Sequence, residues 1–302
     1  MGKKIIHNGM LADAREAMFS LDDVDVTYGY GCYETLKVRD GLLYFPEFHI
    51  ERLLNSAAIL GITHTCDSRK IREGLGLLVC SHGEGDYNIK ILLIGHDDRP
   101  ADWFAIPLAA LHPPVGSEEN GVPCLVFHGE RHFPQAKSLS MLLSTVAYRK
   151  ASSLGCYDAL LVNRRNEITE GTRTNVFFAY VSEPRVILTP CSRDVLSGIT
   201  RKTFMQALAE AGWECREAPL DLTAVRVGRC ALMVSSTSTK LVPVSSLIVA
   251  DGTEGCAPAA GPGKSVAAET IRLPILPELK EAATLYGQWL DRYARKESSG
   301  HD

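Results

Sequence analysis

Four places between residues 137 and 244 carry side chains that could act together in one reaction. The first is Lys137, in QAKSLSMLL, between a polar stretch and an apolar one. A lysine can form an imine with an aldehyde cofactor, although a lone lysine is more often an ordinary solvated residue. The second is Glu170, in ITEGTRTNVF. Its carboxylate is suited to pair with a protonated pyridine nitrogen, and an exposed turn carboxylate is the plainer interpretation.

The other two places have the features of a phosphate site. LSGITR opens an amphipathic helix at Ile199 and Thr200, and the free N–H groups and dipole of a helix start favour an anion. Ordinary capping by Ser197 or Thr200 is at least as common. In VSSTSTKLVPV an apolar strand runs into hydroxyl residues that include Ser236 and Thr237. A polar loop would explain these residues equally well.

The pattern before Lys137 predicts mostly strands. Asp40-Gly41 is typical of a two-residue hairpin turn. Pro46 starts a helix that runs to about Leu60, with Gly61 after its apolar stripe. Strands outnumber helices here, which indicates an α+β domain. The predicted strands are 3–7, 32–39, 42–45, 88–94, 103–111 and 123–128.

The second half alternates helices and strands after a polar break at 129–136, which we interpret as the link between two domains. The domains are then 1–130 and 131–302. Helices are predicted at 139–154, 199–211 and 278–293, and strands at 159–162 and 175–180, with a turn at 163–166. The stretch 251–265 is rich in Gly, Pro and Ala and is predicted to be a loop.

Composition narrows the classes of partner. The 302 residues carry a net charge of −4 and no basic block, which argues against nucleic acid and anionic membranes as partners. No apolar run is long enough to span a bilayer, and the start of the chain has no signal core. The nine cysteines form no C-x-x-C pair. They are therefore expected to be reduced thiols of a cytoplasmic protein and not metal ligands.

Taken together, these segments resemble the class IV aminotransferases, the fold type IV enzymes that depend on pyridoxal 5'-phosphate (PLP). The matching segments follow the family's order from about Asn8 to Val244, which covers most of the chain. They are NGML, YGYGCYETLKVRDG, HIERLLNSAAILGI, KSLSMLLSTVAYRKASSLGCYDALLVN, ITEGTRTNVF, ILTP, LSGITRKTF and STSTKLVPV. The resemblance implies a two-domain α/β fold, with a smaller N-terminal domain and a larger C-terminal PLP-binding domain. It also implies a homodimer.

The same resemblance implies roles for individual residues. Lys137 matches the lysine that holds PLP as a Schiff base, and Glu170 matches the acid that faces the pyridine nitrogen. Residues that match the phosphate contacts are Arg52, Ile199, Thr200, Ser236 and Thr237. Arg52 shares a polar helix stripe with His49 and Ser56. Without the family pattern, a surface salt bridge to Glu47 or Glu51 would explain Arg52.

Substrate contacts follow from the alternation of strand 32–38. Tyr33, Thr35 and Lys37 share one face, and the resemblance implies that this face looks into the substrate pocket. In D-amino-acid aminotransferases a tyrosine at the Tyr33 position works with an Arg-x-His pair. Here Arg99 falls at the arginine position, beside Asp97 and Asp98, and Ala101 replaces the histidine. Arg173, just beyond Glu170, is either a second substrate contact or a surface residue.

The predicted function is a PLP-dependent transaminase of D-amino-acid-like or broad specificity. It would pass an amino group from an amino acid to a 2-oxo acid in two half-reactions, with Lys137 as general base. A branched-chain L-aminotransferase is an alternative, although Leu142 stands where those enzymes have a tyrosine. A 4-amino-4-deoxychorismate lyase is another, although lyases usually have a threonine at the Glu34 position. A non-catalytic relative would have lost the lysine or the acid, and both are present.

Overall fold

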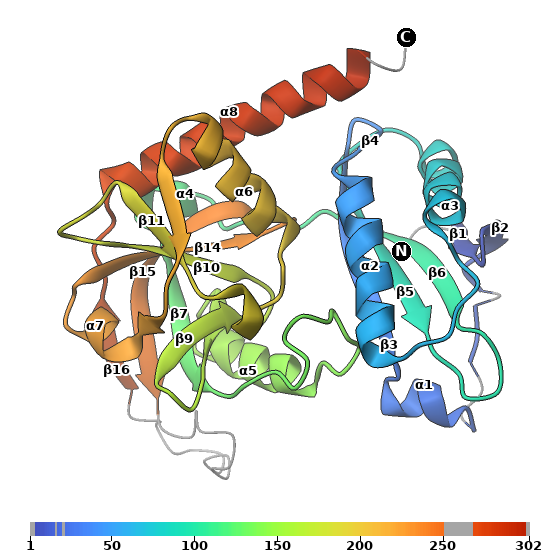
Figure 1. Cartoon of the computed structure of the whole chain (residues 1–302), viewed down its shortest axis with the longest axis horizontal. Coiled ribbons are helices and arrows are strands. Elements are labelled where there is room, and N and C mark those ends of the chain that lie inside the picture. The colour runs from blue at the N-terminus through green and yellow to red at the C-terminus, as the bar shows by residue number, and fades with distance from the viewer. Residues whose placement is uncertain (1–3, 16, 20–21, 251–267, 300–302) are drawn as a thin grey trace. The chain divides into compact units, whose positions relative to one another are not determined.

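The computed structural model describes residues 4–15, 17–19, 22–250 and 268–299, arranged as two compact units (Figure 1). The first unit consists of Met1–His112, Gln135–Met141 and Tyr293–Asp302. The second consists of Pro113–Pro134 and Leu142–Arg292. The units are therefore interleaved along the chain, whereas the sequence predicts one boundary between residues 130 and 131. The loop predicted at 251–265 lies outside the described residues.

The first unit is built on a six-stranded antiparallel sheet in the order β2-β1-β6-β5-β3-β4. Its hairpin turn at Asp40 and Gly41 is as predicted, because both residues have positive φ angles, 48° and 75°. The strands are β1 (Lys4–His7), β2 (Met10–Asp13), β3 (Gly31–Arg39), β4 (Leu42–Leu43), β5 (Tyr87–Ile94) and β6 (Asp102–Ala109).

Two long helices of the first unit, α2 (Pro46–Leu60) and α3 (Ser68–His82), pack on one face of this sheet (Figure 1). A short helix, α1 (Val24–Tyr28), precedes β3. The prediction of α2 is confirmed, and α3 was not foreseen. The shared core contains Leu36, Ile89, Ile91, Leu53 and Leu75, all without exposed surface. Burying such side chains stabilises the fold by roughly 1.5–3 kcal/mol each.

The second unit holds a ten-stranded sheet, of which six strands close on themselves in the order β10-β14-β15-β7-β8-β9. The closure is the pairing of Glu170 with Asn175. The strands are β7 (Val122–His128), β8 (Asp158–Val162), β9 (Glu167–Gly171), β10 (Asn175–Tyr180), β11 (Val186–Thr189), β12 (Glu214–Glu217), β13 (Leu220–Asp221), β14 (Cys230–Ser236), β15 (Lys240–Ala250) and β16 (Ala268–Arg272).

The strand β7 belongs to this second sheet, although the sequence placed it in the N-terminal domain. It runs parallel to both β8 and β15, and only the folded structure brings those partners to it. The remaining elements are α4 (Ser117–Asn120), α5 (Leu142–Ser153), the 3-10 helix η1 (Ser192–Asp194), α6 (Ile199–Glu210), α7 (Leu222–Arg226) and α8 (Pro277–Ser299). No helix in the described ranges is long and apolar enough to cross a membrane.

Candidate active site

The segment around Lys137 belongs to the first unit and is fixed there by hydrogen bonds of its backbone. The carbonyl oxygen of Lys137 accepts the N–H of Tyr33 at 2.9 Å, and the N–H of Leu139 donates to the carbonyl of Gly31 at 2.8 Å. On its other side, the N–H of Lys137 donates to Ser56 Oγ on α2 at 3.0 Å. The position of Lys137 is thus set by one strand and one helix. Its side chain takes no part in these bonds and extends to within 4.5 Å of the centre of the Tyr33 ring.

The polar stripe predicted on α2, formed by His49, Arg52 and Ser56, is buried. His49 and Arg52 contact the carboxylate of Glu34 on β3. Arg52 donates from Nε to Glu34 Oε1 at 2.6 Å and from Nη2 to Glu34 Oε2 at 2.8 Å. His49 Nδ1 lies 2.7 Å from Glu34 Oε2. Two parallel hydrogen bonds from arginine to a carboxylate fix both groups firmly. The salt bridge of Arg52 is therefore made with Glu34, and not with the Glu47 or Glu51 that the sequence suggested.

Burial and charge together set the ionisation of this cluster. Burial raises the pKa of Glu34, but the charge of Arg52 and the hydrogen bonds from Arg52 and His49 outweigh it and lower the pKa to about 2. For His49, burial lowers the pKa, and the hydrogen bond to Glu34 opposes that shift. A neutral His49 that donates from Nδ1 fits these directions. Within the described chain, its buried Nε2 then has no hydrogen-bond partner.

The alternation predicted for β3 is confirmed by burial. Tyr33 and Thr35 are half-buried, whereas Glu34 and Leu36 on the opposite face have no exposed surface. Lys37 is 9% exposed and lies with Nζ 5.6 Å from the centre of the Tyr44 ring. The two faces of β3 therefore differ in kind, one packed against α2 and the other carrying Tyr33, Thr35 and Lys37.

Arg99 is engaged by a partner that the sequence did not suggest. It donates from Nη1 to Asp102 Oδ2 at 2.5 Å, three residues along the chain. Asp102 also accepts from Asn8 Nδ2 at 2.7 Å, and His96 Nε2 lies 3.2 Å from Oδ2. Asp97 and Asp98, the partners considered from the sequence, are not the ones used. Arg99 is thus part of a local polar cluster.

In the second unit Glu170 is 4% exposed and has two donors. Arg131 donates from Nη1 to Oε1 at 3.1 Å, and the N–H of Leu196 donates to Oε2 at 3.2 Å. Each contact presents a proton to one carboxyl oxygen, so together they fix the orientation of the group. Sequence reasoning missed Arg131, which lies 39 residues away in the polar break.

Leu196, whose N–H donates to Glu170, lies in a short loop before α6. Asn175 holds this loop in place. Asn175 donates from Nδ2 to the carbonyl of Leu196 at 2.9 Å. Gly198 is the N-cap of α6 and offers no side-chain cap, and a Cβ there would overlap Asn175 Oδ1. Ile199 and Thr200, the first residues of the helix, are buried. Such an uncapped helix start presents free N–H groups that suit an anion.

The hydroxyl residues after β14 form a turn that leads into β15. Ser236 Oγ lies 2.8 Å from Thr239 Oγ1 and accepts the N–H of Thr239 at 3.2 Å. Thr237 is half-buried in the same turn. Ser235, the strand partner of Asn175, is 1% exposed, and its Oγ has no partner among the described residues. A buried hydroxyl without a partner is costly, so this end of the barrel fits a group that accepts hydrogen bonds.

Arg173 is exposed and stacks on two tyrosines. Its guanidinium carbon lies 4.2 Å from the centre of the Tyr148 ring and 5.3 Å from that of Tyr157. Nη2 also donates to the carbonyl of Tyr157 at 2.9 Å. These contacts hold the Arg173 side chain against Tyr148 and Tyr157.

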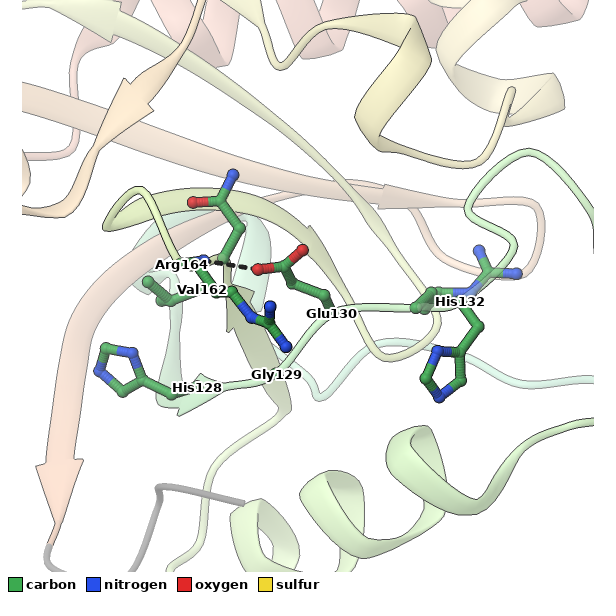
Figure 2. Close-up of a pocket in the computed structure, with 8 residues that line it drawn as sticks. His128, Gly129, Glu130, His132, Val162 and Arg164 are labelled. Carbon is green, nitrogen blue, oxygen red and sulfur yellow. Dashed lines mark hydrogen bonds between the residues drawn. The ribbon is translucent and has the colours of Figure 1, made fainter. Parts of the chain in front are cut away.

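A cavity of about 540 Å³ opens in the second unit where β7 and β8 end (Figure 2). Figure 2 shows Glu130 turned towards Arg164, whose N–H donates to Glu130 Oε1 at 2.6 Å. The cavity is lined by His128, Gly129, Glu130, Arg131, His132, Val162, Asn163 and Arg164. None of the site residues predicted from the sequence lies in this lining. Arg131 connects the cavity to Glu170.

Comparisons with a family model, with curated proteins and with solved structures all give aminotransferases. The family model for amino-transferase class IV matches residues 31–247. A D-alanine aminotransferase of Bacillus licheniformis is 27% identical over 254 residues, 81% of this chain and 88% of the relative. A putative branched-chain-amino-acid aminotransferase of Methanocaldococcus jannaschii is 28% identical over 259 residues, 80% of this chain and 86% of the relative.

The solved structures give the same fold. A hypothetical aminotransferase from Mycobacterium tuberculosis, in its PLP-bound form, superposes with a TM-score of 0.75 at 19% identity. The match covers 94% of this chain and 97% of that one. At this level of identity the likeness concerns the fold.

Proposed function

Given that the chain belongs to the class IV aminotransferase family, we propose that Lys137 is the residue that bonds to PLP and moves the proton during transamination. The family, the use of PLP and the mixed α/β fold are as predicted from the sequence. The observation that carries the proposal is the anchoring of the Lys137 backbone to both Tyr33 and Ser56. These bonds fix the backbone from which the side chain extends and leave the amino group, once deprotonated, to react with the aldehyde.

We assign the phosphate of PLP to the residues that match the phosphate contacts of the family. Two features support this assignment: the start of α6 has no side-chain cap, and Ser235 Oγ has no hydrogen-bond partner within the described ranges. Arg52 donates from Nε and Nη2 to Glu34, which holds its guanidinium in a fixed orientation. The assigned residues are Arg52, Ile199, Thr200, Ser236 and Thr237.

PLP, when bound, supplies an aldehyde that takes up the amino group and a ring that withdraws electrons from the substrate. Lys137 Nζ then acts as general base at the substrate's Cα and later returns the proton. Glu170 would hold a proton on the pyridine nitrogen, and its contacts with Arg131 and the N–H of Leu196 fix its carboxyl group in place. Release of the first keto acid before entry of the second makes the kinetics ping-pong.

For the substrate we propose a D-amino acid or a broad range of amino acids. Tyr33 beside Lys137 supports this choice, and so does the D-alanine aminotransferase among the relatives. The branched-chain L-transaminase stays as the alternative, because the second relative is named as one. Tyr33, Thr35 and Lys37 are the proposed substrate contacts on β3. Arg99 and Arg173 are weaker candidates, since Asp102 and two tyrosines already hold them.

The absorption spectrum of the protein with PLP tests the function. We expect a visible band from covalently bound PLP that bleaches on addition of D-alanine. Bleaching with L-leucine and not with D-alanine would favour the branched-chain alternative. A band that changes with neither amino acid would favour a lyase, and the absence of a band would contradict the assignment of Lys137.

Substituting Gly198 with alanine is expected to weaken PLP binding by roughly tenfold or more. The added methyl group would overlap Asn175 Oδ1, so the start of α6 must shift. Its N–H groups would then no longer point towards the phosphate. Fluorescence titration of PLP measures the effect. Gly287→Ala on α8 is the matched control, because a Cβ there meets nothing within 4 Å. Equal affinity of the Gly198 variant and wild type would remove the helix start from the site.

We further propose a homodimeric enzyme of the cytoplasm. The resemblance of the sequence supports the dimer. The cysteines of the described ranges, eight free thiols, suit a reducing compartment. Light scattering after size-exclusion chromatography should give twice the mass of one chain, and a single-chain mass would contradict the dimer.

A further inference from the structure

Lys90 is a half-buried lysine on β5 that has no part in the roles described above. It pairs directly with Thr35 of β3, and Tyr33 pairs with Leu92, two residues further along. Paired residues of antiparallel strands point to the same face, so Lys90 shares the face of Tyr33 and Thr35. Its Nζ lies 5.2 Å from the centre of the Tyr33 ring.

Two ammonium groups therefore gather at one tyrosine, since Lys137 Nζ is 4.5 Å from the same ring centre. Neither Lys90 nor Lys137 forms an ion pair within the ranges that the structure covers. The nearest acid along the strand, Glu34, lies on the opposite face and is held by Arg52. Like charges repel, and attraction to the tyrosine ring offsets this only weakly where water has access.

An anion at this face would reduce this repulsion in the protein without PLP. Once PLP is bonded to Lys137, Lys90 remains as the lysine ammonium group beside Tyr33. We propose that Lys90 binds a carboxylate of the substrate beside Tyr33. The inference rests on the proposed function in one respect: Lys137 marks where the reacting atoms lie. Arg99 is less suited to bind this carboxylate, because it already donates to Asp102 Oδ2 at 2.5 Å. A lysine in the middle of a paired strand can reach a carboxylate with little loss of backbone freedom, because the sheet has already ordered its backbone.

Two carboxylates have the required chemistry. One is the α-carboxylate that every amino acid and 2-oxo acid carries. The other is a second carboxylate at the end of an acidic side chain. Glutarate and valerate separate these sources, because both have five carbons, neither can react, and only glutarate has a second carboxylate.

The test compares the binding of glutarate and valerate by titration calorimetry in wild type, Lys90→Met and Lys90→Arg, all saturated with PLP. We expect Lys90→Met to weaken glutarate binding by about tenfold or more, as loss of a hydrogen bond to a charged group does. Lys90→Arg should retain most of the affinity. Lys70→Met makes the same change on an exposed position of α3 and should bind as wild type does.

The pattern of binding to the two acids distinguishes the two roles of Lys90. A loss for both acids assigns Lys90 to the α-carboxylate, and a loss for glutarate alone assigns it to the second carboxylate. Unchanged binding of both acids in Lys90→Met overturns the proposal, and so does wild-type protein that binds neither. Binding is measured without turnover. A failure of transamination would therefore leave this result readable, and a failure of binding would leave the proposed activity standing.

Discussion

Replacing Lys137 with alanine is expected to abolish transamination and the visible band of covalently bound PLP, while the protein remains folded. The loss of general-base catalysis alone is worth roughly 10²–10⁴-fold in rate, and the covalent bond is lost with it. The fold should survive because the bonds that anchor this segment use the backbone of Lys137, which alanine keeps. Turnover of the amino acid, the absorption spectrum and circular dichroism measure the three effects.

A matched control is Lys70→Ala, an exposed lysine of the same unit. It should keep the band and the rate. Borohydride reduction followed by mass spectrometry gives a check that needs no turnover: PLP should become fixed to the peptide that contains Lys137. Fixation to a different lysine would overturn the assignment, as would a Lys137→Ala variant that retains full activity.

The second large effect concerns stability. Glu34→Gln is expected to lower the free energy of unfolding by about 3–5 kcal/mol, because the charge of Arg52 stays buried without its counter-ion. Urea unfolding followed by circular dichroism measures it. The control is Glu73→Gln, which breaks the exposed pair with Arg69 on α3 and should leave stability essentially unchanged.

The two roles of Arg52 can be separated by a double variant. Glu34→Leu combined with Arg52→Met replaces the buried ion pair with apolar side chains, which is often neutral for stability. We expect it to recover stability relative to Glu34→Gln and to retain PLP poorly. Tight PLP binding by this variant would show that Arg52 serves the fold and not the phosphate.

The same cluster predicts a pH dependence. The pKa of Glu34 is about 2 in the folded protein against an ordinary 4.5. The stability it contributes is complete above pH 4.5 and is lost as pH falls towards 2. His49 acts in the same direction, because burial lowers its pKa below 6.5 and only the unfolded chain then takes up the proton. Unfolding curves of Glu34→Gln should therefore depend less on pH between about 4.5 and 2, and an unchanged slope would contradict this account.

The elements that the sequence predicted well are those with a local signal. The alternation of Cys32 to Arg39 and the Pro46 and Gly61 boundaries of α2 depend on residues a few positions apart. The start of α6 at Ile199 was recognised for the same reason. The family segments gave the fold and the activity, which no single local pattern carried.

What the sequence did not reveal depends on distant partners. Glu34 and Arg52 are 18 residues apart in the sequence, and Arg131 and Glu170 are 39 apart. Neither pair can therefore be recognised from a local periodic pattern. The helix α3 was overlooked because its glycines, Gly74 and Gly76, weaken a helical pattern. Gly74 is needed there, since a Cβ would meet the Trp103 ring at 2.7 Å. No local pattern indicates that β7 pairs with β8 and β15, because both partners follow it in the chain.

The interleaving of the two units has a consequence for synthesis on the ribosome. A nascent chain that ends at His112 contains every strand of the first sheet, yet the edge of β3 from Gly31 to Tyr33 still lacks the segment that covers it. That segment arrives only after β7 has been made, whose own partners are not yet translated. An open edge invites pairing with other chains. Early fragments of this protein should therefore depend on chaperones until Lys137 and its neighbours close the strand.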